Sequence, residues 1–168
     1  MQKILVSACL FGQPVRYDGS HCFQKHFLWK RWLEEDRLLP ICPEVIGGLS
    51  TPRPPAEWLE GDGTSVVMGH AARLISIDGD DVLPHFQRGA DKTLAFAKAH
   101  NIAIAILKSK SPSCGFGRIY DGSFSGMLID GDGLTAARLK NIGVQIYNEH
   151  QLEEAQSALE KLEPTEKT

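Results

Sequence analysis

The run NIAIAIL at residues 101–107, followed by KSKSPSCGFG at residues 108–117, decides the fold of this chain. A continuous run of apolar β-forming residues, without polar alternation, is typical of a parallel strand that is covered on both faces. We therefore expect a core strand at Ile102–Leu107. The lysines, serines and single cysteine that follow it would lie at the carboxyl end of this strand, where open α/β sheets bind their ligands.

Further strands and helices are expected on both sides of this strand. The other core strands are expected at Lys3–Ala8, at Leu38–Cys42 and over VQIYN, residues 144–148. The helices are expected over FQKHFLWKRWLEE from Phe23, from the N-cap Asp81 to about His100, over LTAARLKNIG at 134–143 and over EHQLEEAQSALEKLE at 149–163. This alternation predicts the α/β class, with a Rossmann-like open parallel sheet and helices on both of its faces. A single domain would span residues 1–163, and residues 164–168 would form a flexible tail.

Two stretches interrupt the alternation of strand and helix. The proline-rich segment CPEVIGGLSTPRPP at residues 42–55 predicts a rigid loop without regular structure. The segment at residues 56–78 predicts a small β-excursion, with Gly61-Asp62-Gly63 as its turn. In the flanking helices, the apolar spacing predicts that Phe27 is buried and that Leu162 ends an apolar stripe.

Composition limits the classes of protein to consider. The chain has 168 residues and a formal net charge of −3, which gives no bulk electrostatic footprint for nucleic acid. No apolar run is long enough to span a bilayer. The apolar start MQKILVSACLFG is too short for a signal peptide and ends at Gly12-Gln13-Pro14. We therefore expect a cytoplasmic protein whose four cysteines are reduced thiols rather than disulfides.

Three of the cysteines follow three expected strands. Cys9 ends the first strand, Cys42 ends the second, and Cys114 lies a few residues beyond the third. Because parallel strands end at one edge of a sheet, these residues can converge in one crevice although they are far apart in sequence. From the residues alone, three interpretations stay open: small buried apolar side chains, ligands of a metal or cluster, or one nucleophilic thiol.

The spacing of the cysteines discriminates among metal sites. A structural zinc site usually takes four ligands with close C-x-x-C pairs, and a dithiol redox site also uses C-x-x-C. The chain contains neither pattern. Three cysteines suit a [4Fe–4S] cluster in which one iron has no protein ligand and acts as a Lewis acid. Neither G-x-G-x-x-G after the first strand nor G-x-x-x-x-G-K-[ST] is present, so a nucleotide phosphate site is not expected.

Three long motifs resemble one family. SACLFGQPVRYDG, CPEVIGGLSTPRPPAE and KSKSPSCGFGRIYDGSFSG are similar to the motifs of the thiouracil desulfidase (TudS) family, over roughly residues 4–148. The resemblance implies a Rossmann-like enzyme with a [4Fe–4S] cluster, which removes sulfur from 2-thiouracil to give uracil and hydrogen sulfide. It places the cluster ligands at Cys9, Cys42 and Cys114. Cys22 is outside the pattern, and we expect it to be a packing residue.

The resemblance also places the catalytic residues. The catalytic glutamate falls on Glu44 and the catalytic serine on Ser111. We expect Glu44 to act as general base toward water, with capping of the next turn as the alternative. We expect Ser111 to relay a proton or orient the substrate, with an ST-turn before Pro112 as the alternative. Ser113 competes for the same role and is an expected substrate ligand.

Cationic residues around the three cysteines complete the expected site. Lys108, Arg16 and Arg53 are expected substrate ligands, with Lys110 nearby, because cationic groups stabilise thiolate-ligated iron and favour an anionic substrate. The alternative is an ordinary solvated basic loop. Tyr17 and Tyr120 are further candidates for stacking on a base, and the sequence does not decide between them.

Three other functions compete with a desulfidase of a free thiolated pyrimidine. One is a desulfidase of thiolated tRNA uridine, which is disfavoured by the negative net charge. Another is a regulatory module that binds a metal or cluster without catalysis. The third is a hydrolase with Cys114 as nucleophile, for which no histidine lies at the expected sheet edge. The oligomeric state is left open.

Overall fold

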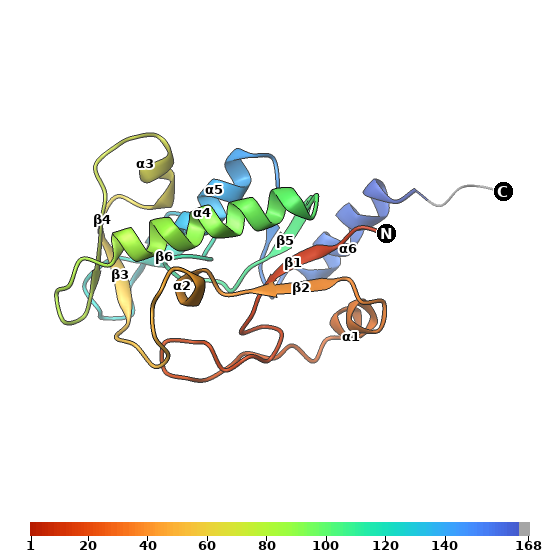
Figure 1. Ribbon diagram of the computed structural model, residues 1–168, viewed down its shortest axis with the longest axis horizontal. Helices are drawn as coiled ribbons and strands as arrows, with labels where there is room; N and C mark the ends of the chain where they lie inside the picture. Colours follow the sequence, from red (N-terminus) through yellow and green to blue (C-terminus); the bar gives the residue numbers. More distant parts are fainter. Residues whose placement is uncertain (165–168) are drawn as a thin grey trace.

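The core of the molecule is a parallel sheet of four short strands. The structure is a computed structural model that describes residues 1–164. The strands β1 (Ile4–Ser7), β2 (Leu38–Ile41), β5 (Ile104–Ile106) and β8 (Gln145–Tyr147) lie in the order β2-β1-β5-β8, all parallel (Figure 1). The predicted α/β class with an open parallel sheet is confirmed. Residues 165–168, most of the expected tail, lie outside the described residues.

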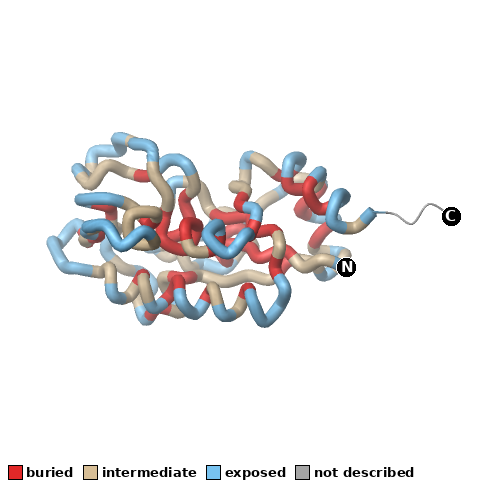
Figure 2. Tube along the Cα trace, turned by 90° about the horizontal axis from the view of Figure 1, so that it is seen from above, coloured by how far each residue is buried: buried red, intermediate tan, exposed pale blue. Residues whose placement is uncertain are grey.

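Helices cover both faces of this sheet, as predicted. Helices α1 (Phe27–Glu34) and α6 (Leu152–Leu162) share one core cluster with the side chains of Ile4 and Val6. Leu5 packs into a second cluster with residues from α4 (Leu83–Ala99) and α5 (Leu134–Asn141). Alternate side chains of a strand point to opposite faces, so one central strand contributes to both cores. Figure 2 shows the resulting band of buried residues between exposed outer segments.

Two small antiparallel sheets flank the main sheet. Strands β3 (Ala56–Glu60) and β4 (Arg73–Ser76) pair with each other and enclose the short helix α3 (Gly63–Val67). This pair is the predicted β-excursion. Strands β6 (Arg118–Tyr120) and β7 (Leu128–Asp130) form a second hairpin, which the sequence did not predict.

The expected turn at Gly61-Asp62-Gly63 is instead the start of α3. The Asp62 side chain accepts a hydrogen bond from the Ser65 backbone N–H, and the Ser65 hydroxyl bonds the Asp62 backbone N–H in return. This reciprocal pair satisfies backbone donors that a helix start leaves free. The turn prediction was therefore wrong because the same residue types also cap helices.

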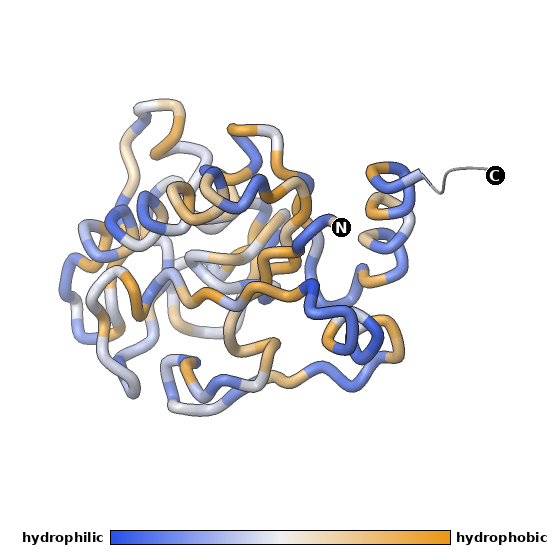
Figure 3. Tube along the Cα trace, turned by 45° about the vertical axis from the view of Figure 1, so that its right-hand side comes forward, coloured by the Kyte–Doolittle hydropathy of each residue, from blue (hydrophilic) through white to orange (hydrophobic). Residues whose placement is uncertain are grey.

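Two burial predictions in the helices were wrong. Helix α1 begins at Phe27 rather than Phe23, because the His26 side chain accepts a hydrogen bond from the Leu28 N–H and caps the helix. Phe27 is 65% exposed, and its neighbours turn toward the core instead. Leu162 is 40% exposed, because it is the last residue of α6. The remainder of α6 alternates hydrophobic and hydrophilic segments along its coil, as Figure 3 shows.

The proline-rich segment contains a helix that the sequence did not predict. Helix α2 (Pro43–Ile46) follows β2 directly and starts with a proline, which is tolerated in a first turn. It packs closely on α4: a Cβ added at Gly89 would lie 1.9 Å from the Pro43 carbonyl oxygen, and one at Gly47 would lie 2.2 Å from the His85 carbonyl oxygen. Glycine at these positions therefore permits the close approach that fixes the residues around Pro43.

Candidate active site

The three cysteines at the strand ends line one cavity of about 470 Å³. The strand register aligns Ser7 of β1 with Ile41 of β2, so these strands end at the same level. Cys9 follows β1, Cys42 follows β2, and Cys114 follows β5 in the chain. The chain connects β1 to β2 on one side of the sheet and β5 to β8 on the other side. The cavity therefore lies where the direction of the strand order reverses, which is where open α/β sheets bind ligands.

The loop that carries the third cysteine is fixed from two sides. The first backbone N–H groups of α5 donate to it, from Leu134 to the Pro112 carbonyl at 3.0 Å and from Thr135 to the Ser113 carbonyl at 2.9 Å. The indole N–H of Trp58 in β3 donates to the same Pro112 carbonyl at 3.1 Å. The loop carbonyls thus accept hydrogen bonds from the free N–H groups at the start of α5 and from the buried Trp58 indole. These hydrogen bonds hold the loop in place.

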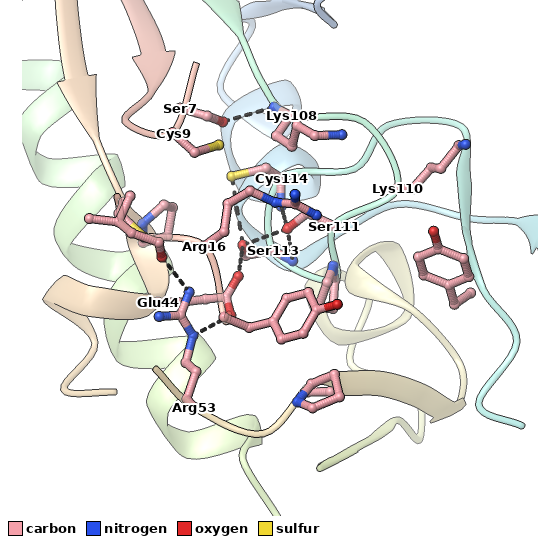
Figure 4. Close-up of a pocket in the computed structure, with 18 of the residues that line it drawn as sticks. Ser7, Cys9, Arg16, Glu44, Arg53, Lys108, Lys110, Ser111, Ser113 and Cys114 are labelled. Carbon is pink, nitrogen blue, oxygen red and sulfur yellow. Dashed lines mark hydrogen bonds and ion pairs between the residues drawn. The ribbon is translucent and has the colours of Figure 1, made fainter. Parts of the chain in front are cut away.

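The thiols of the three cysteines form no disulfide, and the surrounding protein limits their contact with water. Burial raises the pKa of Cys9 and of Cys114 to about 12 each, and it also raises the pKa of Cys42. Such thiols are uncharged near neutral pH unless a positive centre lies beside them, so they are poor nucleophiles by themselves. A bound metal supplies the positive charge that turns a thiol into a thiolate ligand. Figure 4 shows the sulfur atoms of Cys9 and Cys114 pointing into the same space.

The donor set has the chemistry of an iron–sulfur site. Three cysteine thiols line the cavity, and none of the histidines that the structure describes does. Cysteine thiolates are the usual protein ligands of iron–sulfur clusters, so the residues present fit a [4Fe–4S] group.

The fourth cysteine lies beside this group without lining the cavity. The backbone N–H of Cys22 donates to the Cys9 carbonyl at 2.8 Å. Its side chain packs against the core cluster together with Phe11 and Val15. This placement agrees with the expected packing role.

A line of polar contacts joins Glu44 to both serines of the cysteine loop (Figure 4). The Arg53 Nε donates to Glu44 Oε1 at 3.1 Å, and the Ser113 hydroxyl donates to Glu44 Oε2 at 3.0 Å. The Ser111 hydroxyl lies 3.0 Å from the Ser113 hydroxyl. Both serines line the cavity, but Ser113 is 1% exposed whereas Ser111 is half-buried, so Ser111 is the more accessible of the two.

The Ser111 hydroxyl also stabilises its own turn. It accepts hydrogen bonds from the backbone N–H groups of Ser113 and Cys114, at 3.2 and 3.1 Å. These are the contacts of the ST-turn considered from the sequence. The turn and the catalytic assignment are compatible, because a hydroxyl oxygen that accepts from the backbone still carries a proton to donate.

Arg53 lines the cavity but is bound by protein acceptors. Its side chain is 5% exposed, and besides Glu44 its guanidinium donates to the Val15 carbonyl at 2.9 Å and to the Thr51 hydroxyl at 3.0 Å. Its backbone N–H donates to the Tyr17 carbonyl at 2.8 Å. The geometry therefore directs Arg53 toward Glu44.

Lys108 also lines the cavity, and like Arg53 it is bound by acceptors within the protein. Its ammonium lies 3.0 Å from Glu149 Oε1, and its backbone N–H donates to the Ser7 hydroxyl at 2.8 Å. Burial opposes ionisation of Glu149, but hydrogen bonds from Ser109 outweigh it and, with the charge of Lys108, lower the pKa of that carboxyl. The sequence reasoning missed Glu149, which lies just beyond the fourth core strand, where its position at a strand end was the available signal.

Arg16 and Lys110 have fewer protein contacts. Arg16 lies over the Tyr17 ring, 5.8 Å from its centre, and reaches the Ser20 hydroxyl only at 3.4 Å. Lys110 is exposed and forms no ion pair with any residue that the structure describes. Both line the cavity and are the cations with donors left for a bound molecule.

The opposite wall of the cavity comes from the two small sheets. It contains Glu57 of β3 together with Tyr120, Phe124 and Gly126 of the β6–β7 hairpin. The sequence reasoning missed Glu57 and Phe124. The one available signal was an acidic residue inside the apolar strand segment AEWL, because an acid at a buried strand position needs a partner.

Comparison with known proteins places this cavity in a family. A family model described as 2-thiouracil desulfurase matches residues 4–151. The chain belongs to the 2-thiouracil desulfurase family. This membership confirms the resemblance seen in the three motifs, and all of the cavity residues described above lie inside the matched range.

Proteins that resemble the chain include one curated protein and one solved structure. The uncharacterized protein YbbK of Bacillus subtilis (strain 168) is 46% identical over 149 residues, which cover 89% of this chain and 97% of YbbK. The solved structure, described as the [4Fe–4S]-dependent thiouracil desulfidase TudS, is 44% identical and covers 96% of this chain and 99% of its own, with a TM-score of 0.87. The fold and the family therefore agree.

Proposed function

We propose that the protein is a [4Fe–4S]-dependent desulfidase that acts on 2-thiouracil or a related thiolated pyrimidine. In this reaction water replaces the sulfur, so that 2-thiouracil and water give uracil and hydrogen sulfide without net oxidation or reduction. The observation that carries the proposal is the cavity where Cys9, Cys42 and Cys114 meet Glu44 and Ser111. The similar TudS structure, described as a [4Fe–4S]-dependent thiouracil desulfidase, supports it.

Cys9, Cys42 and Cys114 would hold the cluster. The cluster would supply Lewis-acid chemistry through an iron without a protein ligand, which would polarise the thiocarbonyl group and make its carbon electrophilic. The buried, uncharged state of the free thiols means that cluster binding releases protons.

Glu44 is the proposed general base toward the attacking water. The ion pair with Arg53 fixes the orientation of its carboxylate, and the Ser113 hydroxyl occupies one lone pair of Oε2. Each carboxylate oxygen has a further lone pair, so Glu44 can still accept a proton from water. Glu44 itself lines the cavity, as the role requires.

Ser111 is the proposed catalytic serine, and Ser113 connects it to Glu44. Since Ser113 is buried, it acts by fixing both neighbours rather than by touching the substrate. In this proposal Ser111 orients the water or the ring, or passes a proton along the line from Ser111 through Ser113 to Glu44. Among the cations predicted as substrate ligands, Arg16 is our candidate for direct contact, while Arg53 and Lys108 position other groups.

The proposed partner is a small thiolated pyrimidine in the cytoplasm. A cavity of about 470 Å³ has the size of a small-molecule site. The net charge of −3 does not favour a polyanion such as RNA. A reducing compartment suits four free thiols. No helix among residues 1–164 is long and apolar enough to cross a membrane.

Anaerobic reconstitution and a product assay test the proposal. The protein should turn brown, bind about four irons and four sulfides per chain, and release uracil and sulfide in equal amounts from 2-thiouracil. Failure to bind iron would contradict the proposal. Iron-loaded protein that releases no sulfide would favour the regulatory module instead.

A further inference from the structure

The side of the cavity that faces away from the sheet contains a buried carboxylate with no assigned role. Glu57 lies in β3, is 9% exposed and lines the cavity. It forms no ion pair with any residue in the described range 1–164. A buried carboxylate needs hydrogen bonds in place of water, so its contacts indicate what it is for.

One oxygen of Glu57 holds the β6–β7 loop. Glu57 Oε1 accepts hydrogen bonds from the backbone N–H groups of Gly122 and Phe124, each at 3.1 Å. The loop also packs directly on β3, because a Cβ added at Gly122 would lie 2.6 Å from the Trp58 carbonyl oxygen. Phe124 has a positive φ of 55°, a backbone state that is uncommon outside glycine and persists only where contacts fix it.

The other oxygen of Glu57 is available to a ligand. Oε2 takes part in none of the hydrogen bonds among residues 1–164, and it is not one of the fully buried polar atoms without a partner. Since Glu57 lines the cavity, Oε2 is an acceptor that a molecule bound there can reach.

We propose that Glu57 is a specificity-determining residue: its Oε2 accepts a hydrogen bond from a ring N–H of the pyrimidine, while its Oε1 holds Phe124 beside the ring. This inference rests on the proposed function, because it assigns the ring-binding part of the same site. 2-Thiouracil carries a ring N–H on each side of the carbon that loses sulfur. A hydrogen bond from one of them to a carboxylate is charge-assisted and stronger than a neutral one.

Phe124 supplies the apolar contact that such a ring needs. Tyr120 and Phe124 line the cavity from one hairpin, and Ile77 also lines it. Aromatic side chains stack on planar bases whatever the ring substituents, so they contribute affinity while the carboxylate contributes selectivity. One carboxylate thus links the two parts of ring recognition.

Binding of uracil and its two N-methyl isomers to the cluster-loaded protein tests this inference. Uracil is the proposed product, so its dissociation constant can be measured by calorimetry without turnover. We expect the wild type to bind one N-methyl isomer at least tenfold more weakly than uracil, because the methyl group removes the N–H that Glu57 accepts. Glu57→Gln presents an amide N–H₂ in place of Oε2, and we expect it to bind uracil about tenfold more weakly and to lose the discrimination between isomers.

Matched variants separate this role from a structural one. Glu60→Gln changes an exposed acid on the same strand, and Met127→Ala changes an exposed residue of the same hairpin; both should bind like the wild type. Phe124→Ala should weaken all three ligands about tenfold and keep the discrimination, as loss of a stacked ring predicts. Each variant should keep its cluster absorbance.

The outcomes distinguish this inference from the proposed function. Equal binding of uracil and both isomers by the wild type, or unchanged discrimination in Glu57→Gln, would overturn the role of Glu57 while sulfide release from 2-thiouracil continues. A cluster-loaded wild type that neither binds uracil nor releases sulfide would overturn the proposed function, and this inference with it.

Discussion

The two walls of the cavity are built by different means. The wall with the three cysteines comes from the ends of parallel core strands, so the sheet itself brings Cys9, Cys42 and Cys114 together. The opposite wall comes from two small antiparallel sheets, and its position depends on individual side-chain contacts, such as those of the Glu57 carboxylate with the backbone of the β6–β7 loop. Backbone topology therefore determines the proposed cluster site, while side-chain contacts determine the proposed ring site. Substitutions on the two walls should therefore impair different properties, namely cluster binding on one wall and ligand binding on the other.

The largest effect is expected on the cysteine wall. Cys114→Ala should abolish both cluster binding and sulfide release, because two thiols cannot replace three around the cluster. Iron content and visible absorbance of anaerobically reconstituted protein measure this. Cys22→Ala is the matched control and should keep its iron, since Cys22 does not line the cavity. Normal iron content in Cys114→Ala would remove this residue from the ligand set.

Glu44 separates chemistry from cluster binding on the same wall. Glu44→Gln should retain iron but lower kcat by about 10²- to 10⁴-fold, the usual contribution of a general base. Steady-state release of sulfide from 2-thiouracil measures the change. Glu34→Gln, an exposed acid on α1, should leave the rate unchanged. A Glu44→Gln variant with near-normal kcat would show that another group accepts the proton.

The packing of α2 on α4 tests how the fold positions Cys42 and Glu44. Gly89→Ala places a Cβ 1.9 Å from the Pro43 carbonyl oxygen, so the helices must separate. We expect a loss of about 1–3 kcal/mol in the free energy of unfolding and a reduced iron content. Urea denaturation and iron analysis measure both. Lys98→Ala, at an exposed position of α4, is the control. Unchanged iron and stability would mean that α2 is not held by this contact.

The smallest effect is expected for the contribution of Glu149 to folding stability at acidic pH. The pKa of Glu149 is lowered in the folded protein, so below its ordinary value of 4.5 the unfolded chain takes up a proton that the native state does not. The stability contributed by Glu149 is therefore present above pH 4.5 and is lost as the pH falls toward the lowered native pKa. Urea midpoints at pH 6 and pH 4 should differ less in Glu149→Gln than in the wild type. An equal difference would mean that its contacts do not favour the charged form.

The wall with the three cysteines was largely predictable from the sequence, whereas the opposite wall with Glu57 and Phe124 was not. Apolar runs such as NIAIAIL identify parallel strands, and parallel strands share an edge, so the common location of the cysteines follows from topology. Cys114 lies several residues beyond β5, and its final position also depends on contacts of its loop with α5 and Trp58. The β6–β7 hairpin has a glycine- and serine-rich sequence without alternation, and nothing in it signals a strand pair. The role of Glu57 depends on long-range bonds to Gly122 and Phe124, which no local pattern encodes.

Local errors had separate origins. Asp62 caps α3 through a specific hydrogen bond, whereas aspartate also favours turns, which explains the turn predicted before α3. Histidine is not among the preferred N-cap residues, so no signal in the sequence indicated that α1 starts after His26. The three cysteines came from strand position and motif resemblance together, whereas Glu44 and Ser111 came from the resemblance; all five residues line one cavity.

Mössbauer spectroscopy of protein reconstituted with ⁵⁷Fe tests the central claim most directly, namely that three distant cysteines hold one cluster with an iron open to substrate. Spectra are compared with and without 2-thiouracil under anaerobic conditions. We predict that one iron of the four differs from the others and that its signal alone changes when 2-thiouracil is added. Four irons that all keep their signals in the presence of 2-thiouracil would contradict the account.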